Sequence, residues 1–544
     1  MSLELRRRHF LAAGMGGVAA LSLPGSLRAA TMGGGFTHGV ASGEPGPDRV
    51  LLWTRYPGTA DRTELSYEVA EDAGFGRIVA EGPLTASEET GHCAKAVASG
   101  LDPATWYFYR FRAPDGTMSV TGRTRTLPAE GLDPFRMAVV SCSNLPYGYF
   151  NAYAHAAERN DVHLAIHLGD YFYEYAQGTY PDARTKVPGR DLEPKHEILT
   201  LADYHARYAT YRADRDLQRL HQVLPMVSMW DDHEFANDAW TGGAENHQPE
   251  TEGSWDARKA AAYAAYRHWL PVEDEVYRTY EIGDLATLYK VDTRIEGRDK
   301  QIDVAEVIAR AGSPQAGLEL LRGTVWPDPA RQLLGAAQER WLVDAFGASV
   351  AAGKRWQVLA QQVVMGETFT PPEVTDWIPA DAPAVMMERL TAALALAKVG
   401  LPNNLDAWGG YPAARSRVLA GAQAADANLV VLAGDSHNAW AFDLAEGRKP
   451  AGVEFGMQSV TSPGYEAYFT RTDPARMREA LLASSPELRW CDTSNRGYGV
   501  VTLSAEEARC DWVFVDTIAA RAPTAAKTGR SMATAHGRKA LEVV

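Results

Sequence analysis

Two patterns of apolar positions divide the chain. Between residues 36 and 130, short runs rich in β-branched and aromatic residues alternate with turn residues, for example at 50–54, 65–69 and 106–111. Clusters of proline, glycine and aspartate, such as 45–48, separate these runs. Short strands at close turn spacing are typical of a small β-sandwich. We therefore predict an all-β sandwich domain over residues 36–130.

A second pattern begins after a linker at 127–134 that is rich in proline, glycine and acidic residues. Short apolar runs are followed by polar loops, and helical stretches such as 257–270 and 338–346 lie between them. The five runs are residues 135–140, 162–168, 226–229, 285–291 and 428–433. Apolar runs of this length suit strands buried on both faces, with helices covering the sheets. We predict an α/β (α+β) domain over residues 134–520 and a C-terminal tail over 521–544.

Each of the five apolar runs ends in a cluster of polar residues. The clusters are Ser141–Asn144, Gly169–Tyr173, Trp230–Glu234, Asp292–Arg294 and Gly434–His437. A single cluster of this kind can be a turn or a helix N-cap. Ligands of open α/β sheets, however, bind where the carboxyl ends of the strands meet. Five clusters in the same position therefore predict one shared site.

The side chains in these clusters are of types that bind metal ions. Asp170 follows a glycine at a strand end and has two oxygens, one for each of two cations. Tyr173 reaches the same place if the loop begins a helical turn; otherwise its ring packs against the loop. Asp435 and His437 alternate in a loop and so face the same way. Cys142 is either a small core residue or a thiolate ligand.

The cluster around residue 233 suggests acid catalysis. Carboxylates on both sides of His233, including Asp232, raise the pKa of its ring, so that it can donate a proton to a leaving group. Asn237 lies close enough in sequence to offer a neutral oxygen to a hard cation. The alternative for the whole segment is a solvated acidic turn.

Composition excludes several classes of protein. The chain has 544 residues, of which 46% are hydrophobic and 23% are charged, as in ordinary globular proteins. A net charge of −15 argues against a nucleic-acid-binding or anionic-membrane surface. Four cysteines are too few for a disulfide framework. No internal stretch approaches the roughly 18 apolar residues of a membrane span, so we expect no transmembrane anchor in the mature form.

Residues 1–30 have the order of an export signal. Three arginines, Arg6–Arg8, precede Phe10 and a Gly/Ala-rich apolar run that ends at Leu23, and small residues follow at Ala29–Ala30. This order predicts a twin-arginine-type signal peptide, recognised by the twin-arginine export machinery, and a periplasmic or secreted protein. The alternative is a basic helix on a cytosolic protein. Removing the four arginines and one glutamate of this segment changes the net charge to −18.

These loop motifs, taken in order, resemble those of the PhoD family of exported alkaline phosphatases and phosphodiesterases, relatives of the calcineurin-like metallophosphoesterases. Further matching segments are Phe36–Pro45, Leu52–Arg55, Trp408–Pro412 and Ser459–Gly464. The resemblance implies a metallophosphatase fold, with two stacked β-sheets flanked by helices, behind a fibronectin-III-like β-sandwich.

The resemblance also implies a set of metal and substrate ligands. Ferric iron would be held by Cys142, Asp170, Tyr173 and His437. Calcium would share Asp170 and take Asp435 with an oxygen from either Asp232 or Asn237. His233 would protonate the leaving alcohol, and Asn144 and Arg294 would bind the phosphate. An ion pair at the rim is the alternative for Arg294, and Zn²⁺ or another divalent pair is the alternative for the metals.

Three functions are compatible with these features. The first is an exported, metal-dependent phosphoesterase that hydrolyses small phosphate monoesters or diesters, nucleotide-derived diesters included. The second is a phospholipase D that acts on phospholipids. The third is a polymer-binding protein with a vestigial metal site. The presence of every candidate ligand argues against the third.

Overall fold

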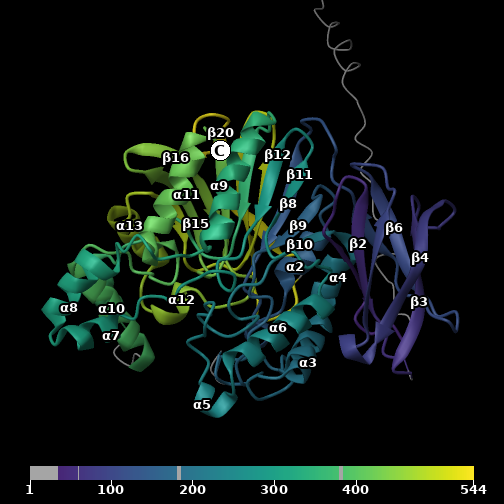
Figure 1. Ribbon diagram of the computed structural model, residues 1–544, viewed down its shortest axis with the longest axis horizontal. Coiled ribbons are helices and arrows are strands. Elements are labelled where there is room, and N and C mark those ends of the chain that lie inside the picture. Colours follow the sequence, from purple (N-terminus) through teal and green to yellow (C-terminus); the bar gives the residue numbers. More distant parts are fainter. Residues whose placement is uncertain (1–34, 59, 181–184, 379–383, 523) are drawn as a thin grey trace, which may run out of the picture.

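The computed structural model describes residues 35–58, 60–180, 185–378, 384–522 and 524–544 (Figure 1). The predicted signal segment, 1–30, lies outside these ranges. The described chain forms three sheets of ten, seven and four strands. Among the described residues, no helix combines the length and the apolar character that crossing a bilayer requires.

The ten-stranded sheet contains strands from both ends of the chain. In spatial order they are β21 (Glu542–Val543), β20 (Ala526–Ala535), β19 (Glu507–Val515), β18 (Gly497–Leu503), β8 (Phe135–Val140), β9 (Leu164–His167), β10 (Met226–Ser228), β1 (Val40–Gly43), β2 (Arg49–Arg55) and β5 (Cys93–Ser99). At its centre, β8, β9 and β10 are parallel.

The seven-stranded sheet is built from the second half of the chain. Its order is β11 (Arg278–Ile282), β12 (Ala286–Lys290), β13 (Trp356–Ala360), β14 (Leu429–Ala433), β16 (Lys449–Gly456), β15 (Ala439–Glu446) and β17 (Leu488–Asp492). Strands β12, β13, β14 and β16 are parallel. The five apolar runs predicted as strands are therefore confirmed as β8, β9, β10, β12 and β14, with boundaries that agree to within two residues.

The two large sheets pack face to face. One apolar core contains Val139 and Ile166 from the ten-stranded sheet and Leu288 and Val430 from the seven-stranded sheet. Because both faces of each sheet are apolar, the outer faces need helical cover. The helices on the ten-stranded sheet are α2 (Asn151–Ala157), α3 (Leu201–Arg212), α4 (Arg215–Val223) and α6 (Trp255–Trp269). Those on the seven-stranded sheet are α9 (Ala336–Ala351), α11 (Pro412–Ala424) and α13 (Pro474–Ser484). The helices predicted at 257–270 and 338–346 are confirmed as α6 and α9.

The N-terminal β-rich region differs from the separate sandwich predicted over 36–130. A four-stranded sheet of β4 (Ile78–Ser87), β3 (Arg62–Ala70), β6 (Trp106–Arg112) and β7 (Gly122–Arg125) shares a core with β1, β2 and β5. Those three strands, however, extend the ten-stranded sheet, because β1 pairs with β10 at Gly43 and Met226. This pairing covers the backbone edge that β10 would otherwise leave open. At Gly43, a Cβ atom would lie only 2.4 Å from the Pro271 carbonyl oxygen, so the close approach requires glycine.

The C-terminal residues 521–544, predicted as a tail, instead extend the same sheet. Strand β20 pairs antiparallel with β19 along nine registered positions, and β21 pairs with β20. Without β20, the outer edge of β19 would expose a row of unpaired backbone groups. The segment named a C-terminal tail therefore contributes two strands to the ten-stranded sheet.

Two segments between the strands form a small helical layer. It contains α7 (Val304–Ala311), α8 (Pro314–Leu320), a π-helical turn at Leu321–Val325 and α10 (Ala384–Lys398). Its own apolar cluster includes Val307, Leu321 and Leu396. Figure 1 shows this layer at the end of the molecule opposite the four-stranded sheet.

Candidate metal centre

The loops that follow the parallel strands converge on one buried cluster. Its potential ligand atoms lie within 4.8 Å of one another in three overlapping groups: Cys142 with Asp170 and His437, Asp170 with Asp232 and His233, and Asp231 with Asp232 and Asp435. Asp170 and Asp232 each belong to two groups. The structure therefore brings together side chains from loops after β8, β9, β10 and β14, which are separated by up to nearly three hundred residues.

Four residues of this cluster have left-handed backbone conformations. The φ angles are 60° at Cys142, 54° at Asp170, 58° at Asp435 and 63° at His437. Such conformations cost about 1–3 kcal/mol each outside glycine and are concentrated at functional sites. Neighbouring loops hold them: the Cys142 amide donates to the Gly169 carbonyl at 3.1 Å, and the Ser143 amide donates to the Asp170 carbonyl at 2.8 Å.

The Tyr173 hydroxyl lies at the centre of one group. It is 3.0 Å from Asp170 Oδ2 and 3.1 Å from His437 Nε2, and it accepts a hydrogen bond from Ser462 Oγ at 2.6 Å. His437 Nδ1 lies 2.8 Å from the Pro463 carbonyl and must donate to it, because a carbonyl only accepts. In the neutral ring, Nε2 of His437 therefore carries the lone pair that faces Tyr173 and Asp170, as metal binding requires.

Acidic groups in the cluster lack the partners that their burial demands. Asp170 Oδ1, Asp231 Oδ2 and Asp232 Oδ1 are buried, and within the described part of the chain none of them has a hydrogen-bond partner. Unpaired buried carboxylate oxygens are costly. These three oxygens and the neighbouring sulfur and imidazole donors therefore fit one or more cations.

The pKa values of the acidic groups in the cluster are shifted by burial and by the neighbouring negative charges. Burial, followed by the charge of Asp170, raises the pKa of the Cys142 thiol and the Tyr173 phenol well above their usual values. Burial also raises the pKa of Asp435 to about 6, although Arg294 opposes the shift. A cation at this position would reverse these shifts, because it favours thiolate, phenolate and carboxylate.

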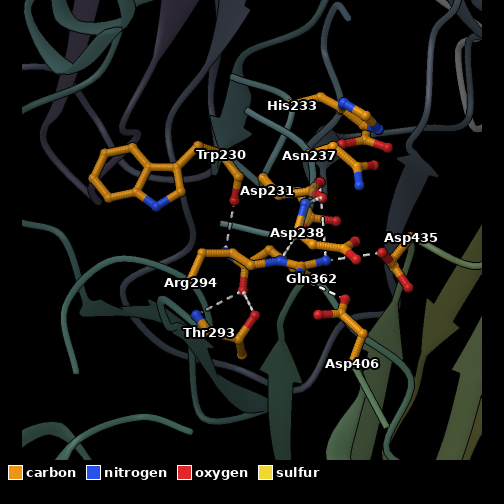
Figure 2. Close-up of polar contacts among 12 residues, drawn as sticks. Trp230, Asp231, His233, Asn237, Asp238, Thr293, Arg294, Gln362, Asp406 and Asp435 are labelled. Atoms are coloured by element: carbon orange, nitrogen blue, oxygen red, sulfur yellow. Dashed lines mark hydrogen bonds and ion pairs between the residues drawn. The ribbon is translucent and has the colours of Figure 1, made fainter. Parts of the chain in front are cut away.

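Arg294 is completely buried and its guanidinium is occupied by carboxylates (Figure 2). Nε donates to Asp231 at 2.5 Å, and the two terminal nitrogens donate to Asp406 at 2.7 Å and to Asp435 at 2.8 Å. These contacts correspond to the ion pair that is the alternative for Arg294, and its assignment as a phosphate ligand stays a prediction. In the structure its guanidinium contacts three carboxylates around the cluster.

Of the two calcium-ligand candidates, Asp232 lies beside the other acidic groups. It belongs to two of the three groups formed by histidine, cysteine and acidic side chains, and its second oxygen accepts a hydrogen bond from the Asp238 amide at 2.6 Å. The Asn237 side chain is partly exposed, and its amide nitrogen donates to Glu245 at 3.0 Å. Both residues stay candidates for the calcium ligand.

His233 is held by a carboxylate that the sequence analysis did not single out. Its Nδ1 lies 2.6 Å from Glu174 Oε2, and its ring centroid lies 4.2 Å from that of Tyr173. Burial lowers the pKa of His233, but the charges of Asp232 and Glu174 outweigh it, and the pKa lies well above its usual value. The charged ring donates Nδ1–H to Glu174 and presents Nε2–H.

Asn144 is buried two residues after Cys142. In the described residues neither its amide nitrogen nor its amide oxygen has a partner, whereas its backbone carbonyl accepts from Thr461 at 2.7 Å. An unpaired buried amide beside the cluster is available to hydrogen-bond a bound group.

Three contributing residues were missed by the sequence analysis. Glu174 directly follows the Gly169–Tyr173 motif, so an acidic residue next to that motif was the available signal. Ser462 lies in the Ser459–Gly464 segment that carries the resemblance, but a serine there gives no sign of contact with Tyr173. Asp406 follows no apolar strand and had no signal.

Comparisons with known proteins agree with this arrangement. A family model described as PhoD-like phosphatase matches residues 137–512, and the model of the family's N-terminal domain matches residues 22–128. Alkaline phosphatase D of Bacillus subtilis (strain 168) is 32% identical over 505 residues, covering 88% of this chain and 77% of the relative. A solved structure titled "Structure of PhoD" superimposes with a TM-score of 0.75 at 29% identity, covering 94% of this chain and 92% of that chain. The chain belongs to the PhoD-like phosphatase family and is a phosphatase enzyme.

Proposed function

We propose that this phosphatase is a metal-dependent hydrolase of small phosphate monoesters and diesters. The observation that carries the proposal is a set of three buried carboxylate oxygens, from Asp170, Asp231 and Asp232, that have no hydrogen-bond partner among the described residues. They lie among thiol, phenol and imidazole groups in a place where burial makes an uncompensated negative charge unfavourable.

The donor types support iron and calcium as the two metals. Cys142, Tyr173, His437 and Asp170 would hold ferric iron, because anionic sulfur and phenolate donors stabilise a high oxidation state. Asp170, Asp232 and Asp435 offer the oxygen ligands that calcium prefers. When bound, the cations would neutralise charge on the phosphate and activate water.

The remaining residues would bind the substrate and move the proton. The charged His233 would donate its Nε2 proton to the leaving oxygen, while Glu174 keeps the ring oriented through Nδ1. The Asn144 amide would donate to a phosphate oxygen. Arg294 would keep Asp231 and Asp435 in position.

Three substrates with and without a chelator test the proposal. We expect hydrolysis of p-nitrophenyl phosphate and of its bis-ester, loss of both activities in chelator, and recovery on addition of iron with calcium. Hydrolysis of a phospholipid alone would instead indicate a phospholipase D. A folded, metal-loaded protein with no hydrolysis of any substrate would contradict the proposal and favour a binding protein.

Spectroscopy tests the identity of the first metal. A phenolate bound to ferric iron gives a visible absorption band, so we expect a coloured enzyme and loss of the band in Tyr173→Phe. The matched variant Tyr180→Phe should keep the band. A colourless, active enzyme that contains zinc would contradict iron.

We further propose export of the folded protein through the twin-arginine route, supported by the order of residues 1–30. Replacing Arg7 and Arg8 with lysine should retain the protein in the cytoplasm, as fractionation would measure. The same replacement at Arg6 and Arg28 is the control and should leave export intact.

A further inference from the structure

The loop after the metal centre carries two tyrosines that the reaction does not use. Tyr175 and Tyr180 are partly exposed, whereas Tyr173 is buried. The ring of Tyr180 lies 5.5 Å from that of Tyr173 and 5.7 Å from that of Tyr175. The ring of Tyr175 lies 5.4 Å from that of His233. The four rings therefore form one aromatic cluster that runs from the centre to the surface.

Two more segments bring phenols to the same place. Tyr147 ends the 3₁₀ turn Leu145–Tyr147, and Tyr468 ends the short helix α12 (Tyr465–Tyr468). Burial, followed by the phenols of Tyr468, Tyr175 and Tyr147, raises the pKa of Tyr180 well above its usual value. Tyrosines from three parts of the chain thus lie within electrostatic reach of Tyr180.

The position of the cluster relates it to the leaving group. His233 would protonate the leaving oxygen, and its ring contacts Tyr173 and Tyr175. An alcohol that departs toward His233 therefore comes near Tyr175, and the ring of Tyr180 lies 5.7 Å beyond it.

We propose that Tyr175 and Tyr180 form an aromatic wall that selects esters whose leaving alcohol carries a flat, uncharged ring system, namely nucleoside monophosphates. The inference rests on the proposed phosphoesterase function and names its substrate class. Tyrosine faces stack on nucleobases without regard to base identity.

A matched pair of substrates tests the wall. Adenosine 5′-monophosphate and ribose 5-phosphate share the phosphate and the sugar and differ in the base. We expect kcat/KM to be about tenfold higher for the nucleotide, because one stacked base contributes at least that much in favourable cases. Tyr180→Leu should bring the ratio of the two constants close to one, and Tyr180→Phe should preserve it. The ratio is independent of the fraction of active enzyme.

A control variant and a binding measurement complete the test. Tyr277→Leu removes a tyrosine that packs on Trp341 away from the centre, and should leave the ratio unchanged. In calorimetry on the metal-loaded protein, adenosine should bind more tightly than ribose, and Tyr180→Leu should remove the difference.

The outcomes separate the two proposals. Equal kcat/KM values for the two substrates, equal binding of adenosine and ribose, or a ratio that survives both Tyr175→Leu and Tyr180→Leu would overturn the wall. Failure to hydrolyse p-nitrophenyl phosphate would overturn the phosphoesterase function, and adenosine binding would still decide whether the wall exists.

Discussion

Two clusters of charged residues in this phosphatase are both buried and both contain residues with a positive φ. They differ in how completely their carboxylate oxygens are hydrogen-bonded. Glu44 is buried, has a φ of 46°, and lies where the N-terminal strands meet the ten-stranded sheet. One of its oxygens is 3.3 Å from Lys290 Nζ; the other accepts from Tyr280 at 2.5 Å and from Arg278 at 3.2 Å. Both oxygens are satisfied. At the candidate metal centre, three carboxylate oxygens have no hydrogen-bond partner among the described residues.

The comparison shows which property distinguishes a site from a structural cluster. Burial, acidic charge and positive φ occur in both, so none of them is diagnostic alone. The difference is how completely the carboxylate oxygens are hydrogen-bonded. Lys290, Tyr280 and Arg278 satisfy both oxygens of Glu44, although Arg278 also pairs with Glu273 and Glu275. Arg294, shared by Asp231, Asp406 and Asp435, leaves one oxygen of Asp231 without a hydrogen bond among the described residues (Figure 2). A buried cluster that lacks positive charge either takes up protons, as the raised pKa of Asp435 indicates, or binds a cation.

The largest effect should come from Asp170→Asn. Asp170 belongs to two ligand groups, so the change should lower kcat/KM for p-nitrophenyl phosphate by at least about a thousandfold. The metal-free protein should unfold at the same or a higher temperature, because one of several crowded buried carboxylates is removed. A variant with near-normal turnover would remove Asp170 from the site.

Glu44→Gln should have the opposite profile. Neutralising this side chain leaves Lys290 buried without its partner, which should lower the free energy of unfolding by about 3–5 kcal/mol. Urea denaturation measures the loss. Turnover per folded, metal-loaded molecule should not change; a loss of turnover comparable to that of Asp170→Asn would mean that the two clusters are not functionally distinct.

The charged histidine of the centre should affect substrates unequally. His233→Asn should lower kcat by about a hundredfold for phenyl phosphate, whose leaving group needs a proton. It should lower kcat much less for p-nitrophenyl phosphate, whose leaving group departs as an anion. Equal losses for both substrates would indicate that His233 positions the substrate rather than donating a proton.

The two calcium-ligand candidates can be separated by a pair of substitutions. Asp232→Asn should raise the calcium concentration for half-maximal activity by about ten- to a hundredfold, whereas Asn237→Ala should change it by less than about twofold. Titration of the stripped enzyme with calcium measures both. The reverse result would assign the ligand to Asn237 instead.

The smallest effect concerns His38, a buried histidine six residues before Glu44 in the N-terminal region. Its ring nitrogens lie 2.7 Å from Thr37 Oγ1 and 3.2 Å from the Ala209 carbonyl. Burial, followed by the charges of Arg55 and Arg212, lowers its pKa to about 3. Between pH 6.5 and 3, the unfolded chain therefore takes up a proton that the folded chain does not, and stability falls as the pH falls.

His38→Gln should remove this contribution. The difference in unfolding free energy between pH 8 and pH 5.5 should shrink by about 1.4 kcal/mol relative to the wild type. Replacement of the exposed His196 by glutamine is the control. An unchanged pH dependence in His38→Gln would mean that the ring is protonated in the folded protein.

The sequence by itself determined the elements and the ligand-bearing loops. The run at 135–140 is β8 to the residue, and the run at 428–433 overlaps β14 (Leu429–Ala433). Apolar runs and Gly-Asp turns are local signals, because burial on both faces and a sharp turn restrict which residues can occupy each position. For the same reason Cys142, Asp170 and His437 could be named before their proximity was known.

Only the tertiary structure decided which of these side chains meet, and with what partners. From the sequence, Arg294 could either bind a phosphate or form an ion pair. Its three carboxylate partners come from positions up to 141 residues away. Glu174 and Asp406 became part of the centre only through such distant contacts, and β10 became the neighbour of β1 in the same way. Local patterns encode burial and turn geometry, but the pairing of charges and of strand edges depends on the packing of the whole chain.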